Sequence, residues 1–281
     1  MTIERIGKYT ILGQLGAGAH STILHISRAE DGRQYALKVV PINDPDDKKF
    51  QEQAEHEFRI SQMLDHANLV KIHLLENKTD WLFRVKKVLL LIEYVSNGQT
   101  LDHIKSLSLE KLVPLFTQVA SGLVHMHRRG VLHADMKPNN IVVNPRTNQA
   151  KVIDYGLAWI KGEPKGRVQG TPEYMAPETV TNGIVSEKTD IFNFGAMMYR
   201  MVTWQLPPSL VPQPGTVRID AKVYARLLKP VSECNASAPK PLCELIHQCL
   251  EYKADQRPER MSEIQGTLDK IADDLGPPDD D

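Results

Sequence analysis

The stretch VLHADMKPNN, residues 131–140, decides how the rest of the sequence is interpreted. It places a histidine, an aspartate, a lysine and an asparagine at short spacings in one polar segment. Such side chains can accept a proton, neutralise negative charge and ligate a hard cation. Ala134 interrupts them with a methyl group directly before Asp135. The segment is a candidate functional site, and the residue type at position 134 bears on how the activity of that site is controlled.

Composition limits the alternatives. A chain of 281 residues with a formal net charge of −1 makes one large domain or two lobes and has no bulk signature of a nucleic-acid binder. The longest aliphatic run, residues 88–92, is far too short to cross a bilayer, so we expect a cytoplasmic protein with no membrane segment in this chain. Three cysteines without CxxC spacing predict buried thiols. His125 and His127 lie two apart on an expected helix, which disfavours a shared metal.

Secondary-structure signals change character near residue 100. Before it, β-rich runs predict an antiparallel sheet with strands at residues 8–15, 21–29, 34–40, 69–76 and 88–95. One helix interrupts these strands, with Asp44 as its N-cap, Pro45 at its first position and its end near Leu64. Later helices are expected at 109–129, capped by Ser108 and ended by a left-handed Gly130, and near 187–203, 219–228, 239–252 and 260–274.

The segment LGAGAHSTIL, residues 15–24, is a candidate phosphate loop. Gly16 and Gly18 alone also fit an ordinary hairpin turn. A dinucleotide fingerprint would need glycine in place of Ser21 and a following helix, whereas this sequence continues as a strand, and no GxxxxGK[ST] motif occurs. What remains is a glycine-rich hairpin whose backbone amides can approach phosphate oxygens.

Lys38 lies inside the apolar strand YALKVV, residues 35–40. A lysine on an edge strand, with its ammonium group extended into water, would explain a charged residue at this position. If the ammonium is buried it needs a partner, and the next helix offers Glu55 and Glu57, of which Glu57 lies nine residues before His66. A strand-to-helix ion pair would fix the lysine as a point charge for phosphates.

Two further segments complete the pattern, VIDYGLAW at residues 152–159 and GTPEYMAPE at residues 170–178. In order, the glycine-rich loop, ALKV, the helix glutamate, HADMKPNN, DYG and APE resemble the eukaryotic-type (Hanks-type) serine/threonine protein kinase family over roughly residues 9–272. The opening IGKYTILGQLGAG and the compact activation segment favour a bacterial member.

The resemblance implies an α+β, bilobal fold. Residues 1–95 would form a small antiparallel β-sheet lobe with one helix, and residues 96–275 a larger, mainly helical lobe. Residues 276–281 would be an acidic tail or linker. A regulatory domain or partner beyond residue 281 is part of this expectation.

The resemblance also implies roles for the polar residues. Asp135 would accept or orient the substrate hydroxyl proton, and Lys137 would neutralise charge on the transferred phosphoryl group. Asn140 and Asp154 would hold Mg²⁺, with Mn²⁺ as a substitute. Of the two candidate partners, Glu57 would pair with Lys38. Lys38 would then hold the α and β phosphates of ATP.

The expected ATP-binding residues come from both lobes. Ile92 takes the gatekeeper position, the backbones of Glu93 and Val95 would bond the edge of the adenine, and Ala36 and Val142 would enclose the ring. Plain core packing of these aliphatic side chains is compatible with the same pattern. The full set is Leu15, Gly16, Ala17, Gly18, Ser21, Ile23, Ala36, Lys38, Ile92, Glu93, Val95 and Val142.

Other matched residues are structural or bear on the substrate. Glu178 and Arg257 would form a buried ion pair, and Asp190 would bind backbone amides of the catalytic loop. Lys137 and Thr171, whose hydroxyl can bond Asp135 and Lys137, resemble kinases that act on serine and threonine of protein substrates. The alternatives are a pseudokinase scaffold, which usually lacks one of the residues retained here, and a small-molecule phosphotransferase, which would not need the peptide-docking segment.

Three departures from the family pattern carry expectations. Tyr155 replaces the usual phenylalanine of the metal-binding triplet, so its hydroxyl needs a partner. Ser61 stands where the family usually packs an apolar residue between the lobes, which predicts a weak joint between them. Ala134 removes the arginine that a loop phosphate would neutralise. The loop at residues 157–170 has no serine, threonine or tyrosine and is made basic by Lys161, Lys165 and Arg167. We therefore expect activity without phosphate on this loop; neutral drift at Ala134 is the alternative.

Overall fold

The computed structural model describes residues 4–18, 20–105, 107–163, 169–212 and 219–277. The chain forms two compact units, which are described separately. The first comprises Met1–Asp65, Leu69–Ser96 and Asp154–Gly156, and the second His66–Asn68, Asn97–Ile153 and Leu157–Asp281. The division at residue 95 and the tail at 276–281 stay predictions.

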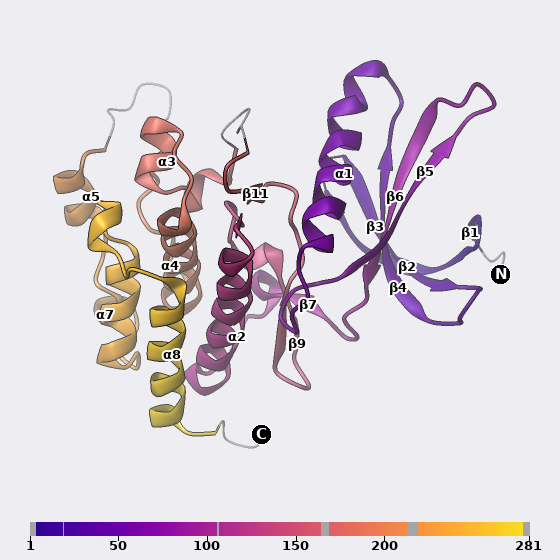
Figure 1. Cartoon of the computed structure of the whole chain (residues 1–281). Coiled ribbons are helices and arrows are strands. Elements are labelled where there is room, and N and C mark those ends of the chain that lie inside the picture. The colour runs from indigo at the N-terminus through magenta and orange to yellow at the C-terminus, as the bar shows by residue number, and fades with distance from the viewer. Residues whose placement is uncertain (1–3, 19, 106, 164–168, 213–218, 278–281) are drawn as a thin grey trace. The chain divides into compact units, whose positions relative to one another are not determined.

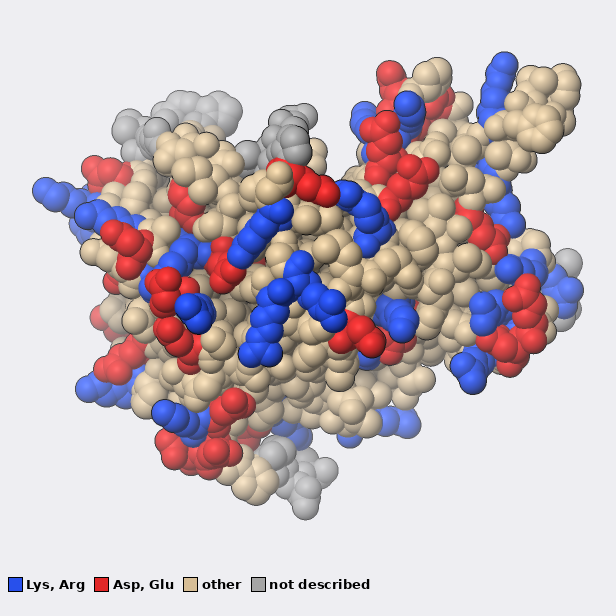
Figure 2. All heavy atoms as spheres, in the orientation of Figure 1, with Lys and Arg blue, Asp and Glu red and all other residues tan. Residues whose placement is uncertain are grey.

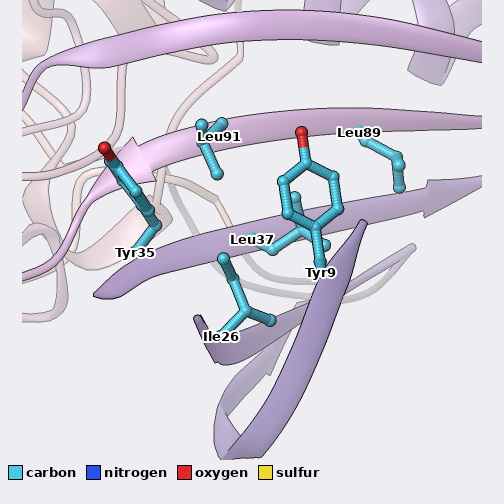
Figure 3. Close-up of a cluster of buried hydrophobic side chains, with 6 residues drawn as sticks. All are labelled: Tyr9, Ile26, Tyr35, Leu37, Leu89 and Leu91. Carbon is cyan, nitrogen blue, oxygen red and sulfur yellow. The ribbon is translucent and has the colours of Figure 1, made fainter. Parts of the chain in front are cut away.

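The first unit is built on an antiparallel sheet, as expected. Among the described residues, its six strands follow the order β1-β2-β3-β4-β6-β5 (Figure 1). Their bounds are β1 Arg5–Ile6, β2 Tyr9–Gly18, β3 Ser21–Arg28, β4 Gln34–Pro41, β5 Ile72–Thr79 and β6 Val85–Glu93. On β4 and β6, Tyr35 with Leu37 and Leu89 with Leu91 stand at alternate positions and so point to one face of the sheet, because successive side chains of a strand point to opposite faces. The cluster in Figure 3 consists of Tyr9, Ile26, Tyr35, Leu37, Leu89 and Leu91.

The helix of the first unit begins as the sequence predicts. The Asp44 side chain accepts a hydrogen bond from the backbone of Asp46, and Pro45 opens a 3-10 turn, Pro45–Asp47, that continues into α1, Lys48–Gln62. The buried face of α1 carries Glu57, whereas Glu55 is exposed. Helical periodicity therefore decides between the two candidate partners of Lys38.

The second unit is mainly helical, which confirms the expected α+β class. Its helices are α2 Leu109–Arg128, α3 Pro177–Asn182, α4 Glu187–Thr203, α5 Ala221–Leu227, α6 Val231–Cys234, α7 Lys240–Cys249 and α8 Met261–Leu275. Short strands, β7 Gln99–Thr100, β8 Val131–Leu132, β9 Ile141–Asn144, β10 Gln149–Val152 and β11 Trp159–Ile160, form the small sheets β10-β9-β7 and β11-β8. The short α3 and α6 were not expected.

Packing in the second unit centres on α4, which is buried along most of its length. It lies beside α7, and α2 lies beside α8 (Figure 1). The close approach depends on Gly195, because a Cβ there would stand 2.6 Å from the Cβ of Cys249. Gly130 follows Arg129, the C-cap residue of α2, and has a φ of +71°, as expected for a helix end. Within the described ranges, no helix combines the length and the hydropathy needed to cross a membrane.

Ser61 has a role that the sequence did not reveal. Its side chain is buried, and its hydroxyl accepts a hydrogen bond from the backbone N–H of Ile72 at 2.9 Å. The register of β5 against β6 shifts between Ile72 and Leu74, so this N–H lies at an irregular point of the sheet. The hydroxyl of Ser61 therefore has a structural partner, which argues against the expected weak joint at this position.

Ser61→Ala and Ser61→Leu should both lower the free energy of unfolding, by about 1–3 kcal/mol, because each leaves the buried N–H of Ile72 without its acceptor. Urea unfolding followed by circular dichroism measures the change. Ser262→Ala, at an exposed position of α8, is the matched control and should leave the midpoint unchanged. A higher midpoint for Ser61→Leu would contradict this account.

Candidate active site

Lys38 on β4 and Glu57 on α1 form a buried ion pair, as predicted. Their Nζ and Oε2 atoms lie 2.6 Å apart, and the Glu57 side chain is 1% exposed. Burial alone would lower the pKa of Lys38, but attraction to Glu57 and to Asp154 outweighs it and raises that pKa above its ordinary value. Lys38 is thus held as a cation in a fixed position.

The DYG triplet belongs to the first unit. Asp154 accepts a hydrogen bond from the Gly156 amide at 2.8 Å, and the Tyr155 hydroxyl donates to the Val70 carbonyl at 2.8 Å. The expected partner of the Tyr155 hydroxyl is therefore a backbone oxygen. A Cβ at Gly156 would lie 2.9 Å from the Gln53 amide nitrogen and 3.1 Å from Asp154 Oδ1, so a larger residue would displace the Gln53 side chain.

The glycine-rich segment is a hairpin between β2 and β3, not the start of a helix. Gly16 lies opposite Ile23, and Gly18 lies opposite Ser21. A Cβ at Gly18 would stand 3.0 Å from the Ser21 hydroxyl, so a larger residue would displace this side chain. The geometry agrees with the hairpin deduced from the sequence.

The other predicted nucleotide residues of this unit lie on neighbouring strands. Ala36 of β4 and Ile92 of β6 are paired and nearly buried. The Glu93 amide donates to the Lys71 carbonyl at 2.8 Å, so this amide is engaged between the strands, and adenine binding by the Glu93 backbone stays a prediction. The ring of Tyr94 stacks on His25 of β3, with ring centroids 4.1 Å apart, a contact that could not be predicted because the two residues are distant in sequence. Leu15 and Ala17 lie on β2, and Val95 follows β6.

In the second unit, four predicted residues meet in one hydrogen-bond network. Lys137 Nζ lies 2.8 Å from Asp135 Oδ2 and 2.7 Å from the Thr171 hydroxyl. The Thr171 amide donates to Asp135 Oδ1 at 2.8 Å, so Asp135 is reached by the backbone of Thr171 and not by its hydroxyl. The Asn140 amide nitrogen donates to the Asp135 carbonyl at 2.8 Å. Val142 lies on β9, just beyond this network.

Asp190 of α4 anchors the catalytic loop, as expected. Its carboxylate is fully buried and accepts the amides of His133 at 2.9 Å and Ala134 at 2.7 Å. The ring of His127 lies 2.8 Å from the same carboxylate. Burial would raise the pKa of Asp190. The hydrogen bonds from His127 and the Ala134 amide, with attraction to His127 and His133, outweigh burial and hold the pKa of Asp190 below its ordinary value. The sequence suggested no such role for His127, which comes from α2.

The predicted ion pair between Glu178 and Arg257 is also present. Two guanidinium nitrogens donate to the two carboxylate oxygens, each at 2.9 Å. Backbone carbonyls of Glu251, Lys188 and Tyr252 accept the remaining hydrogen bonds of Arg257, which is 3% exposed. A buried guanidinium with this many partners is fully compensated.

Ala134 belongs to an apolar cluster that sequence reasoning missed. Leu132, Ala134 and Val185 are buried together, and Trp159 of the activation segment packs against them. Trp159 is paired with Leu132 across strands β11 and β8. The only signal in the sequence was a tryptophan shortly after DYG, and the contact with Val185 depends on tertiary structure.

Lys161 continues this attachment of the activation segment. Its amide donates to the Gly130 carbonyl at 2.8 Å, and its side chain forms an ion pair with Glu187 at the start of α4. Of the other two basic residues expected in this loop, Lys165 and Arg167 both lie outside the described residues.

Asn140 and Asp154 fit a hard cation by their donor chemistry. Asn140 is 5% exposed and commits its amide nitrogen to the Asp135 carbonyl, so its oxygen remains the group that can ligate a metal. Asp154 supplies carboxylate oxygen. They belong to different units, and among the described residues no group of three or more His, Cys, Asp or Glu side chains could hold a metal ion. Ligation by these two residues therefore stays a prediction.

Comparison with known proteins identifies the family. A model of the protein kinase domain matches residues 9–267. Myosin light chain kinase family member 4 of Homo sapiens is 33% identical over 202 residues, 69% of this chain and 49% of the relative. CBL-interacting protein kinase 21 of Oryza sativa subsp. japonica is 31% identical over 213 residues, 72% of this chain and 39% of the relative.

A bacterial relative matches over a longer stretch. Serine/threonine-protein kinase pkn2 of Myxococcus xanthus is 27% identical over 274 residues, 93% of this chain but 32% of the relative. The chain thus spans about half the length, or less, of these curated relatives. With the domain match across most of its residues, the chain belongs to the protein kinase family.

Proposed function

We propose that the chain is a protein serine/threonine kinase that transfers the γ-phosphate of ATP to serine and threonine hydroxyls of protein substrates. The observation that carries the proposal is the network in which Lys137 bonds both Asp135 and Thr171. Relatives named as serine/threonine kinases support the same substrate class. We also propose that it acts in the cytoplasm.

The network suits phosphoryl transfer to a hydroxyl group. Asp135 is fixed by the Thr171 amide on one oxygen and by Lys137 on the other. A carboxylate held in this way can accept or orient the proton of an incoming hydroxyl. The Lys137 ammonium stands beside it and can neutralise charge on the phosphoryl group. Since Thr171 follows the activation segment, its place in the network links peptide docking to the position of the catalytic aspartate.

The residues that the sequence analysis singled out would bind ATP and the metal ion. Lys38, held by Glu57, would bind phosphate oxygens, and Asn140 and Asp154 would ligate Mg²⁺, or Mn²⁺ in its place. The metal would neutralise phosphate charge when it is bound. The pseudokinase alternative is disfavoured because Lys38, Asp135, Asn140 and Asp154 are all retained.

Asp154→Asn should reduce phosphate transfer by about a hundredfold or more, because it removes a carboxylate charge from the metal. The asparagine keeps an oxygen for the Gly156 amide, so the unfolding midpoint should stay unchanged. Transfer from labelled ATP to a generic protein substrate measures the effect, with Asp274→Asn at an exposed position of α8 as control. Equal transfer by the wild type and Asp154→Asn, including no transfer by either, would contradict the enzyme proposal.

We further propose that activity needs no phosphate on the loop at residues 157–170. Three contacts of the unmodified chain support this. Trp159 packs against the Ala134 cluster, the Lys161 amide bonds the Gly130 carbonyl, and the Lys161 side chain pairs with Glu187. Apolar packing at Ala134 thus replaces the arginine whose positive charge a loop phosphate would neutralise. Control would act elsewhere, through α1 or a partner.

Phosphatase-treated protein should turn over substrate at the same rate as autophosphorylated protein, within about twofold, since no loop phosphate contributes to order. Kinetic assays of both forms, with mass spectrometry to locate phosphates, provide the measurement. A large loss of turnover that follows a phosphate between Asp154 and Glu178 would refute the proposal.

A further inference from the structure

The tip of the β5–β6 hairpin exposes aromatic side chains. Trp81 is 84% exposed and Phe83 is 86% exposed, and Leu82 between them is 43% exposed. The other large hydrophobic side chains on the described surface are exposed by 50% or less. Figure 1 shows the hairpin at the end of β5 and β6, and Figure 2 shows uncharged atoms there with basic side chains beside them. Adjacent exposed aromatics of this kind mark an interaction site.

The turn that presents them is a defined structure. Asp80 Oδ1 accepts the amides of Leu82 at 2.8 Å and Arg84 at 3.0 Å. The backbone of Asp80 also bonds the backbones of Phe83 and Arg84. Phe83 has a φ of +59°, a conformation that costs free energy for a bulky residue. Strain of this sort is typical of functional sites, and here it holds an aromatic ring in solvent.

The hairpin next to the tip is basic. Residues 78–87 contain Lys78, Arg84, Lys86 and Lys87 against the single acid Asp80, although the whole chain has a net charge of −1. Lys78 and Lys87 are directly paired across the two strands. The Lys78 ammonium lies 2.7 Å from the Glu76 carboxylate, so Lys78 is compensated within the chain. Arg84, Lys86 and Lys87 are exposed, and they are the cations of the hairpin that an external anion can approach.

We propose that this hairpin tip docks on an anionic lipid surface. Trp81 and Phe83 enter the headgroup region, where aromatic rings gain burial without a fixed partner, and Arg84, Lys86 and Lys87 face the lipid charges. A second copy of this chain fits the tip less well, because the same cations would then approach one another.

Docking would not disturb the predicted nucleotide residues of the same strand. The tip precedes Val85 at one end of β6, and Glu93 lies at the other end, roughly 26 Å away along an extended strand. Binding at the tip would therefore position the kinase domain on a surface and leave Ile92 and Glu93 unaffected. The proposed docking does not depend on phosphate transfer, so either proposal can fail without the other.

Flotation with phosphatidylcholine vesicles, with and without phosphatidylserine, tests the proposal. The chain should bind only the vesicles that contain phosphatidylserine, and added salt should weaken binding. Trp81→Ser with Phe83→Gly should abolish it. Glycine accepts the left-handed backbone at position 83, so this variant should unfold at the same urea concentration or a higher one. Lys86→Gln and Lys87→Gln should each weaken binding about fivefold.

Matched controls lie on α5. Leu227→Ser removes an apolar side chain that is 49% exposed, and Lys222→Gln with Arg226→Gln removes two exposed cations. Neither should change vesicle binding, and the hairpin variants should keep their transfer rate in solution. Failure of the wild type to float overturns the proposal, and so does binding that the hairpin variants retain. A dimer in ultracentrifugation that Trp81→Ser with Phe83→Gly dissociates, without vesicle binding, would assign the tip to a second copy instead.

Discussion

One buried carboxylate organises the catalytic loop. Asp190 has no exposure to water, so its charge must be compensated by hydrogen bonds, and it takes them from the amides of His133 and Ala134 and from the ring of His127. The end of α2 and the loop that follows it are thereby fixed to α4, which is distant in sequence. The position of Asp135, the next residue along the loop, follows from this constraint.

The same constraint explains the residue type at position 134. To give its amide to Asp190, Ala134 adopts a φ of +65°, which costs about 1–2 kcal/mol for a residue with a Cβ. Its methyl group is buried against Leu132, Val185 and Trp159. A long charged side chain at this place would have to leave the cluster to reach water, whereas alanine lets the activation segment pack onto the loop.

Buried charge is compensated in a different way in each unit. In the first, Glu57 contacts Lys38 directly and Asp154 adds a further attraction. In the second, Arg257 is held by Glu178 and by three backbone carbonyls, and loss of any one partner leaves others. Loss of Glu57 would therefore leave a buried ammonium without its direct partner.

The sequence by itself determined the family, the class of fold, most strands and long helices, and the ion pairs of Lys38 and of Arg257. Those features depend on local periodicity, capping and motif order, which a linear pattern contains. Only the tertiary structure decided the role of Ser61, the attachment of His127 to Asp190 and the cluster around Ala134. The partners of Ser61 and Ala134, the Ile72 amide and Val185, have no distinctive residue type, and the partner of His127, Asp190, lies on a helix distant in sequence. A buried hydrogen-bond donor or an apolar surface needs a partner, but the sequence does not say which segment the fold brings to it.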